Sequence, residues 1–157
     1  MGRELVFKLR RIENSESAIE CEDYVCGRDD CTNYIAQEVL DEGGDDEVLV
    51  YKLDDKQDCL KLSNLLDMIS EYAAKDHREI MKAKNYLEDL REARRHCSLY
   101  DEFVKFSEAM DGTQQWLDEE SYSRAAHIYT TLKTFRQKAE DEFGSNVKYE
   151  IIIDLSE

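Results

Sequence analysis

The sequence predicts an α+β fold: a small three- to four-stranded, mostly antiparallel sheet from both termini, with an inserted helical hairpin or bundle. Strand-like patterns lie near both ends of the chain, whereas apolar residues between them recur at steps of three and four. The 157 residues contain no proline, and residues 45–111 also lack glycine, so nothing in that stretch interrupts a helix.

We expect one domain over residues 1–157, because a chain of this length is typical of a single domain. Its predicted parts are an acidic hairpin, helix and strand over residues 1–54, a helical part over residues 55–143, and a closing strand over residues 146–155.

A β-hairpin is predicted at the N-terminus. Residues 5–10 partly alternate between apolar and polar types, as a half-buried strand does. Residues 14–17 are short and polar and predict a turn. In the strand that follows, Ile19, Cys21 and Val25 are expected to share one face.

A short helix and a third strand come next. Asp29 or Asp30 is suited to cap a helix that continues to about Glu42, and Gly43 is expected to stop it. Residues 48–53 then form a β-rich run between acidic turns.

The closing strand has the clearest strand pattern in the chain. Between residues 147 and 155, apolar side chains alternate with Lys148, Glu150 and Asp154. Ile152 interrupts the polar face, which indicates that this face is partly covered.

An apolar seam follows the third strand. Asp76 and Arg94 occupy two of its positions, so the pattern fits either one long helix or two helices that separate near residues 74–77. Burial within one chain is favoured over dimerisation through this seam. Its apolar members are Leu62, Leu66, Ile69, Ala73, Ile80, Ala83, Leu87, Leu90 and Cys97.

Two further helices are predicted. A short one contains Tyr100 and is expected to end at Gly112. A long amphipathic one is expected over residues 117–139, with Asp118 as its cap and Gly144 just past its end.

Negative charge is concentrated in the N-terminal third. The chain has 37 acidic and 21 basic residues, a net charge of −16, and residues 1–60 hold 17 of those acids against 7 bases. Such a field repels nucleic acid and anionic membrane and attracts basic partners. The start of the chain has no apolar segment typical of a secretory signal, and five cysteines are an odd number. We therefore expect a reduced, cytoplasmic protein that does not contact membrane or nucleic acid directly.

No motif identifies a reaction or a cofactor, so we expect a protein that is not an enzyme. Cys21, Cys26 and Cys31 lack a second ligand pair for zinc, and the acids beside them oppose thiolate formation. The acidic run over residues 41–47 lacks the ligand spacing of an EF-hand. No metal or other cofactor is predicted.

The candidate partner-binding surface is formed by two acidic stretches, Glu16–Asp30 and Asp41–Asp58. Tyr24, Tyr34 and Tyr51 lie within or beside them and offer rigid contact area. Solubility alone is the alternative reason for such a composition. The candidate contact residues are Glu20, Glu22, Asp23, Tyr24, Asp29, Asp30, Asp41, Glu42, Asp45, Asp46 and Glu47.

In size and charge the chain resembles small acidic inhibitors of phages and mobile elements, such as anti-restriction and anti-CRISPR proteins. This resemblance implies a viral, non-catalytic nucleic-acid mimic that occludes a basic nucleic-acid-binding enzyme. The alternatives are an immunity protein that blocks a basic toxin, and an assembly subunit that forms a homodimer through the helical seam.

Overall fold

The computed structural model describes residues 4–142 and 146–156, and the α+β prediction is confirmed. The predicted end of the last helix at Gly144 lies outside the described residues. The chain divides into two compact units, which are described separately. Unit 1 comprises Met1–Ala73 and Arg124–Glu157, and unit 2 comprises Ala74–Ser123.

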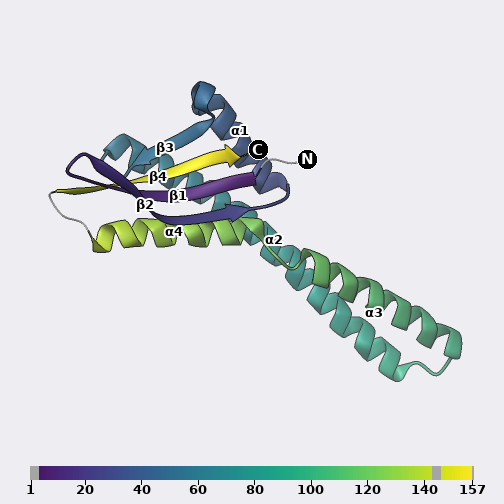
Figure 1. Ribbon diagram of the computed structural model, residues 1–157. Helices are drawn as coiled ribbons and strands as arrows, with labels where there is room; N and C mark the ends of the chain where they lie inside the picture. The colour runs from purple at the N-terminus through teal and green to yellow at the C-terminus, as the bar shows by residue number, and fades with distance from the viewer. Residues whose placement is uncertain (1–3, 143–145, 157) are drawn as a thin grey trace. The chain divides into compact units, whose positions relative to one another are not determined.

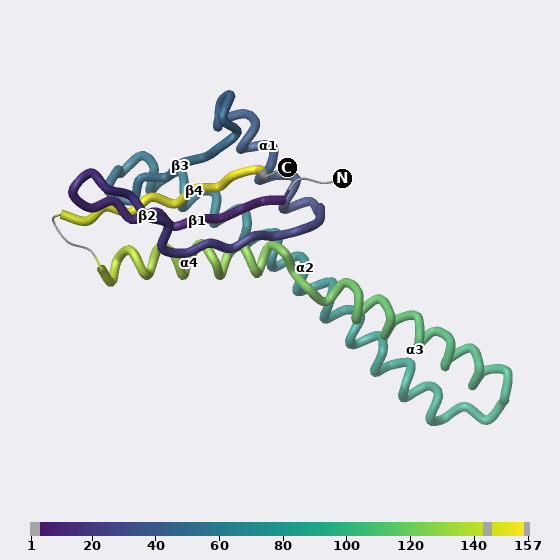
Figure 2. The backbone as a smooth tube through the Cα atoms, in the orientation of Figure 1, coloured from purple at the N-terminus to yellow at the C-terminus, as the bar shows by residue number. Residues whose placement is uncertain are grey.

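Unit 1 contains a four-stranded antiparallel sheet with the strand order β2-β1-β4-β3. Strands β1 and β4 come from opposite ends of the chain and lie side by side at its centre (Figure 2). The strands are β1 (Glu4–Glu13), β2 (Glu16–Val25), β3 (Val48–Lys52) and β4 (Val147–Ser156). The predicted hairpin, third strand and closing strand are therefore confirmed.

A tight turn and a bulge shape the β1–β2 hairpin. Asn14 and Ser15 have φ angles of 52° and 67°, the left-handed conformation typical of a two-residue hairpin turn. Leu9 pairs with Cys21 but Arg10 pairs with Ile19, so Glu20 is an extra residue in β2. The prediction that Ile19 shares a face with Cys21 and Val25 is wrong, because this bulge moves Ile19 to the opposite face, where it is 47% exposed.

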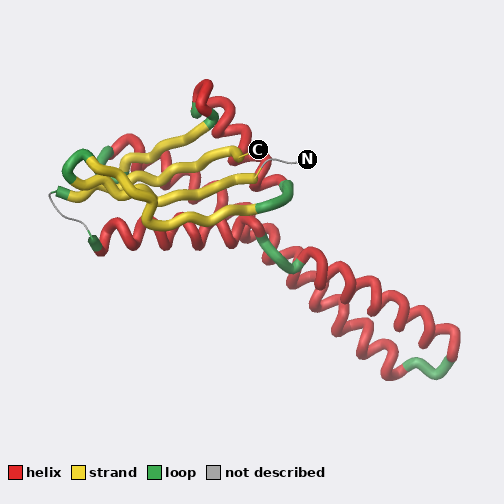
Figure 3. The backbone as a smooth tube through the Cα atoms, in the orientation of Figure 1, coloured by secondary structure: helices red, strands yellow, loops and turns green. Residues whose placement is uncertain are grey.

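Three helical segments cover one face of the sheet (Figures 1 and 3). They are α1 (Asp30–Glu42), the first part of α2 (Lys56–His96), and α4 (Arg124–Asp141). Leu5, Phe7 and Leu9 of β1 point into this core, whereas the residues between them are only half-buried on the other face. On that other face Ile152 is buried, and Glu150 is buried beside Arg10, with 3.0 Å between Glu150 Oε2 and Arg10 Nη2.

Helix α1 begins and ends where the sequence predicts. Asp29 caps it: Asp29 Oδ1 accepts a hydrogen bond from the Thr32 amide, and Thr32 Oγ1 accepts one from the Asp29 amide, each at 2.8 Å. Gly43 ends the helix, and a Cβ atom there would lie 2.3 Å from the Val39 carbonyl oxygen and 2.8 Å from the Val48 amide nitrogen. Glycine is therefore needed at position 43 to let β3 start directly beside the helix end.

Unit 2 is an antiparallel helical hairpin, made by the later part of α2 and by α3 (Tyr100–Glu120) (Figure 1). Leu87, Leu90, Met110 and Leu117 form its buried core. Two expectations about the helices that follow α2 are wrong. Gly112 lies inside α3 and does not end it, because propagation across a single glycine costs only about 1 kcal/mol.

The second wrong expectation concerns the next helix boundary. Leu117 and Asp118 belong to α3, and the chain leaves the helix at residues 121–123 before α4 begins at Arg124. Asp118 accepts a hydrogen bond from Gln114 one turn earlier, at 2.9 Å, and does not cap α4. Apolar periodicity continues across this break, which is why spacing alone did not reveal it.

Helix α2 is continuous, so the single-helix alternative is confirmed. Leu62, Leu66 and Ile69 belong to the core of unit 1, whereas Leu87 and Leu90 belong to that of unit 2. These five members of the seam are thus buried within one chain, whereas Ala73, Ile80, Ala83 and Cys97 are half-buried.

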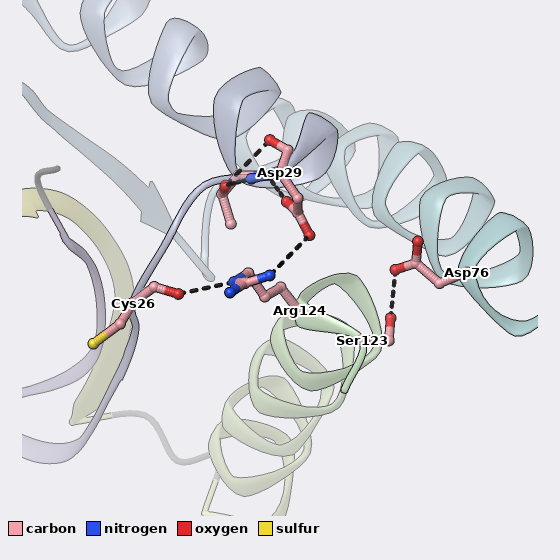
Figure 4. Close-up of polar contacts among 6 residues, drawn as sticks. Cys26, Asp29, Asp76, Ser123 and Arg124 are labelled. Atoms are coloured by element: carbon pink, nitrogen blue, oxygen red, sulfur yellow. Dashed lines mark hydrogen bonds and ion pairs between the residues drawn. The ribbon is translucent and has the colours of Figure 1, made fainter. Parts of the chain in front are cut away.

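The two polar positions of the seam make polar contacts inside unit 2. Asp76 Oδ2 accepts a hydrogen bond from Ser123 Oγ at 2.7 Å, as Figure 4 shows. Arg94 lies over the Phe103 ring and donates to Ser107 Oγ at 3.3 Å. None of the helices that the structure describes combines the length and apolar character needed to cross a membrane.

Candidate functional site

The predicted contact residues of β2 point to two different faces of the sheet. Glu22 and Tyr24 lie opposite Lys8 and Val6 and are exposed on the face without helices. Asp23 lies opposite Phe7 and points to the helix-covered face. Glu20, Glu22 and Tyr24 are accessible to a partner, but Asp23 is held by groups of the chain itself.

Asp23 connects β2 to α4. Its Oδ2 accepts a hydrogen bond from Thr131 Oγ1 at 2.8 Å and lies 2.7 Å from His127 Nε2, while Oδ1 accepts from the Tyr24 amide at 2.9 Å. Burial raises the pKa of Asp23, but the hydrogen bonds from Thr131 and His127 outweigh this effect, so its pKa is lowered overall. These contacts give Asp23 a structural role in joining strand and helix.

Asp29 also has a structural role, shown in Figure 4. Besides capping α1, its Oδ2 lies 4.0 Å from Arg124 Nη1, and Arg124 Nε donates to the Cys26 carbonyl at 2.8 Å. Gly27 makes room for this arginine: its φ is +85°, and a Cβ there would lie 2.6 Å from Arg124 Nη2. The loop between β2 and α1 is therefore fastened to the start of α4.

The remaining predicted acids lie at the other end of α1. Asp41 and Glu42 are in its last turn, Asp45 and Asp46 are in the short 3-10 turn η1 (Gly44–Asp46), and Glu47 follows in a left-handed conformation. Helix α1 has 13 residues and is therefore about 20 Å long, so these acids lie far from Asp29 and Asp30. The eleven predicted residues do not form one site.

Residues 38–47 contain six acids and no base. Two of these acids, Glu38 and Glu42, line a groove of about 380 Å³ between α1, β3 and α2. We call this the acidic groove. Its walls carry the carboxylates of Glu38, Glu42 and Asp58, with Lys61 as its one basic residue. Its other lining residues are Tyr34, Val48, Leu49, Val50, Tyr51, Asn64, Leu65 and Met68.

Two tyrosines give the acidic groove a rigid aromatic part. Tyr51 is 7% exposed, and burial followed by the charges of Glu38 and other neighbours raises its pKa to about 12. Burial, with Glu38 as the next cause, also raises the pKa of Tyr34, whose ring centroid lies 6.1 Å from that of Tyr72. Both phenols stay protonated at neutral pH and can donate hydrogen bonds.

The acidic groove lies along an edge of the sheet, because β3 pairs only with β4. The Leu53 amide donates to Tyr149 of β4 at 3.0 Å. Backbone groups alternate in direction along an antiparallel strand, so those of Val50 and Lys52 face away from β4. Asp58 Oδ2 accepts from the Lys52 amide at 2.9 Å, which closes one end of this edge and leaves Val50 facing outward.

The sequence pointed to part of this groove. Glu42, Tyr34, Tyr51 and Asp58 lie in or beside the predicted acidic stretches, but Glu38 and Lys61 are not among the predicted contact residues. A signal existed for Glu38, because Tyr34, Glu38 and Glu42 are spaced by four and share one helix face. No comparable signal brings Asp58 to the same place, since that depends on how α2 packs against the sheet.

The three clustered cysteines are separated in the structure. Cys21 is half-buried on β2, Cys31 is buried in α1, and the exposed Cys26 donates to Glu4 Oε1 at 3.1 Å, a contact that raises the pKa of this thiol. Across residues 4–142 and 146–156, no three His, Cys, Asp or Glu side chains are grouped as a metal site would need.

Comparisons with known proteins found no match for this chain. No protein-family model matches it, and neither a curated protein nor a solved structure matches its sequence or fold.

Proposed function

We propose that this protein is a non-catalytic, acidic protein-binding module, and that the acidic groove with residues 38–47 is its contact surface. One observation carries the proposal: three carboxylates line a groove whose floor is buried tyrosine, at an edge of the sheet where a strand faces outward. Carboxylates attract basic side chains, and a rigid aromatic floor adds contact area at low entropic cost.

The partner that we favour is a basic protein that handles nucleic acid. Such proteins present Lys and Arg side chains to neutralise phosphates, and these side chains would enter the acidic groove instead. The protein would then act as an inhibitor or regulator by occluding that cationic surface. An immunity protein that blocks a basic toxin would use the same surface.

The test is a capture experiment from nuclease-treated lysate of the source cells, followed by association kinetics with the captured partner. The groove variant carries Glu38→Gln, Glu42→Gln and Asp46→Asn. These substitutions remove three negative charges and keep the shape of the side chains. Asp29 is left unchanged because it caps α1. The control variant carries Glu102→Gln, Glu119→Gln and Glu120→Gln at exposed positions of α3, which changes the charge by the same amount.

We expect the groove variant to associate at least about tenfold more slowly than the wild type at about 0.1 M salt, and the control within about twofold. At about 0.5 M salt the difference should shrink, because exposed charges are screened. An equal loss in both variants would assign the effect to net charge alone. Unchanged rates in both would refute recognition through acids.

A further inference from the structure

The structure leaves one apolar face of unit 2 without a partner. Ala83 and Tyr86 of α2, with Ala109, Gly112, Thr113 and Trp116 of α3, line a shallow groove on this face. We call it the hairpin groove. Tyr86 is 52% exposed and Trp116 is 38% exposed. Both aromatic side chains border a floor of small residues, onto which another helix can pack closely.

This face adjoins the core of the hairpin, because Ala83 and Ala109 line the groove and also pack against that core. The α3 residues Ala109, Gly112 and Trp116 are spaced by three and four, so they form a stripe along the helix. Met110 and Leu117, which pack against α2, lie about a quarter turn away on the same helix. Helix α3 thus carries two adjacent apolar stripes, and the chain buries only one of them.

The buried core of unit 2 is small for a unit of 50 residues. Its buried side chains are Leu87, Leu90, Met110 and Leu117, each 6–9% exposed. A unit below about 70 residues commonly needs a disulfide, a metal or oligomerisation in addition to its core. The cysteine of this unit, Cys97, is a free thiol, so no disulfide adds to this small core, whereas burial against a second copy would.

The charges of the two helices indicate what binds in the hairpin groove. Residues 74–96 of α2 carry seven bases and five acids, whereas residues 100–120 of α3 carry seven acids and one base. Beside the hairpin groove, Lys82 and Lys84 flank Ala83, and Glu108 and Asp111 flank the small residues of α3. A twofold axis that runs along the groove, parallel to the two helices, would set the basic helix of each copy against the acidic helix of the other.

We propose that a second copy of this chain docks on the hairpin groove, so that two hairpins form an antiparallel four-helix bundle. A face of about 30 by 20 Å, the length of α3 and the width of two helices, buries about 1,200 Å² in total. That area is at the lower end of stable interfaces. The net charge of −16 on each copy opposes association at low salt through long-range repulsion. Salt screens this repulsion more than it screens the close pairs between the basic and acidic helices, so dimerisation strengthens as salt is added.

The test uses the full chain and its single tryptophan. Trp116 lies in the hairpin groove and is the only tryptophan in the sequence, so its emission reports docking directly. Sedimentation equilibrium and fluorescence are measured over a concentration series at about 0.5 M NaCl, where charges more than about 5 Å apart are screened. We expect the mass to rise from 18.4 kDa to twice that value as the emission moves to shorter wavelength.

Two variants test the face and one variant controls for charge. Gly112→Arg fills the hairpin groove, and a Cβ at this position meets no atom within 4 Å in the single chain. Tyr86→Glu tests the same face from α2 if the first variant fails to fold, which circular dichroism would show. Gln114→Arg adds the same charge as Gly112→Arg on the far side of α3.

We expect each groove variant to weaken dimerisation at least about tenfold and Gln114→Arg to change it less than about threefold. A wild-type chain that stays monomeric over the whole series overturns the proposal. A dimer in which Trp116 emission does not move, or which folded Gly112→Arg forms equally well, also overturns it, because the interface is then elsewhere.

Discussion

Replacing Tyr51 with phenylalanine should change how the stability of unit 1 depends on alkaline pH. The phenol is buried beside Glu38, Glu42 and Asp58, and burial followed by these charges raises its pKa from 10.0 to about 12. The folded protein therefore holds this proton more tightly than the unfolded chain does. The resulting stability is complete below pH 10 and is lost as the pH rises from 10 through 12.

The magnitude follows from the size of the shift. One pKa unit corresponds to about 1.4 kcal/mol, so the full loss is about 3 kcal/mol. At pH 11, midway between the two values, the loss is about half of that. Tyr51→Phe has no proton to lose at this position. Between pH 9 and pH 11 its free energy of unfolding should therefore fall less than that of the wild type, by about the loss expected for Tyr51 at pH 11.

The assay is urea denaturation of wild type and Tyr51→Phe at pH 9, 10 and 11, followed by circular dichroism. The comparison cancels other groups that titrate in this range, including Tyr34, whose pKa is also raised. Equal losses in the two proteins would mean that Tyr51 is accessible to water in the folded state. The reading of a buried, acid-surrounded phenol at the base of the acidic groove would then be wrong.

Three further predictions test the hairpin core and the loop contacts. Leu87→Ala should destabilise unit 2 by about 2–5 kcal/mol through the cavity that it leaves, and hydrogen exchange should show the loss in that unit; a near-zero loss would contradict the core assignment. Gly27→Ala should lower the free energy of unfolding by about 1–3 kcal/mol, because the left-handed backbone at Gly27 and the nearby Arg124 both exclude a side chain. Gly112→Ala should be neutral or stabilising in the same thermal unfolding measurement. Equal effects of the two substitutions would show that glycine is not required in the loop. Asp23→Asn should lower the free energy of unfolding above about pH 4, where the wild-type carboxylate is charged. The stabilities of the two proteins should converge as the pH falls through the lowered pKa of Asp23. Parallel stability profiles in acid denaturation would exclude this carboxylate as the source of the pH dependence.

Local signals predicted unit 1 well. Asp29 caps α1 and Gly43 ends it, because capping depends on residues three or four apart in the chain. The hairpin, β3 and β4 follow from alternation and turn residues, which are equally local. The charge of residues 38–47 was likewise readable from composition, and it borders the groove that the structure reveals.

Other features needed contacts between distant residues. The bulge that moves Ile19 is set by pairing with β1, and nothing in β2 itself marks it. The internal roles of Asp23 and Asp29 depend on His127, Thr131 and Arg124, which are about 100 residues away in the sequence. Acids used for structure and acids available to a partner look alike in a sequence.

The sequence by itself determined the fold class, the start and end of α1 and the concentration of negative charge, because propensity, capping and charge are properties of neighbouring residues. Only the tertiary structure decided that one helical seam serves two cores, that Asp58 joins Glu38 beside Tyr51, and that a second apolar stripe of α3 stays uncovered. Periodicity identifies an apolar stripe, but only packing between distant segments shows which stripe is buried and which carboxylates share a groove.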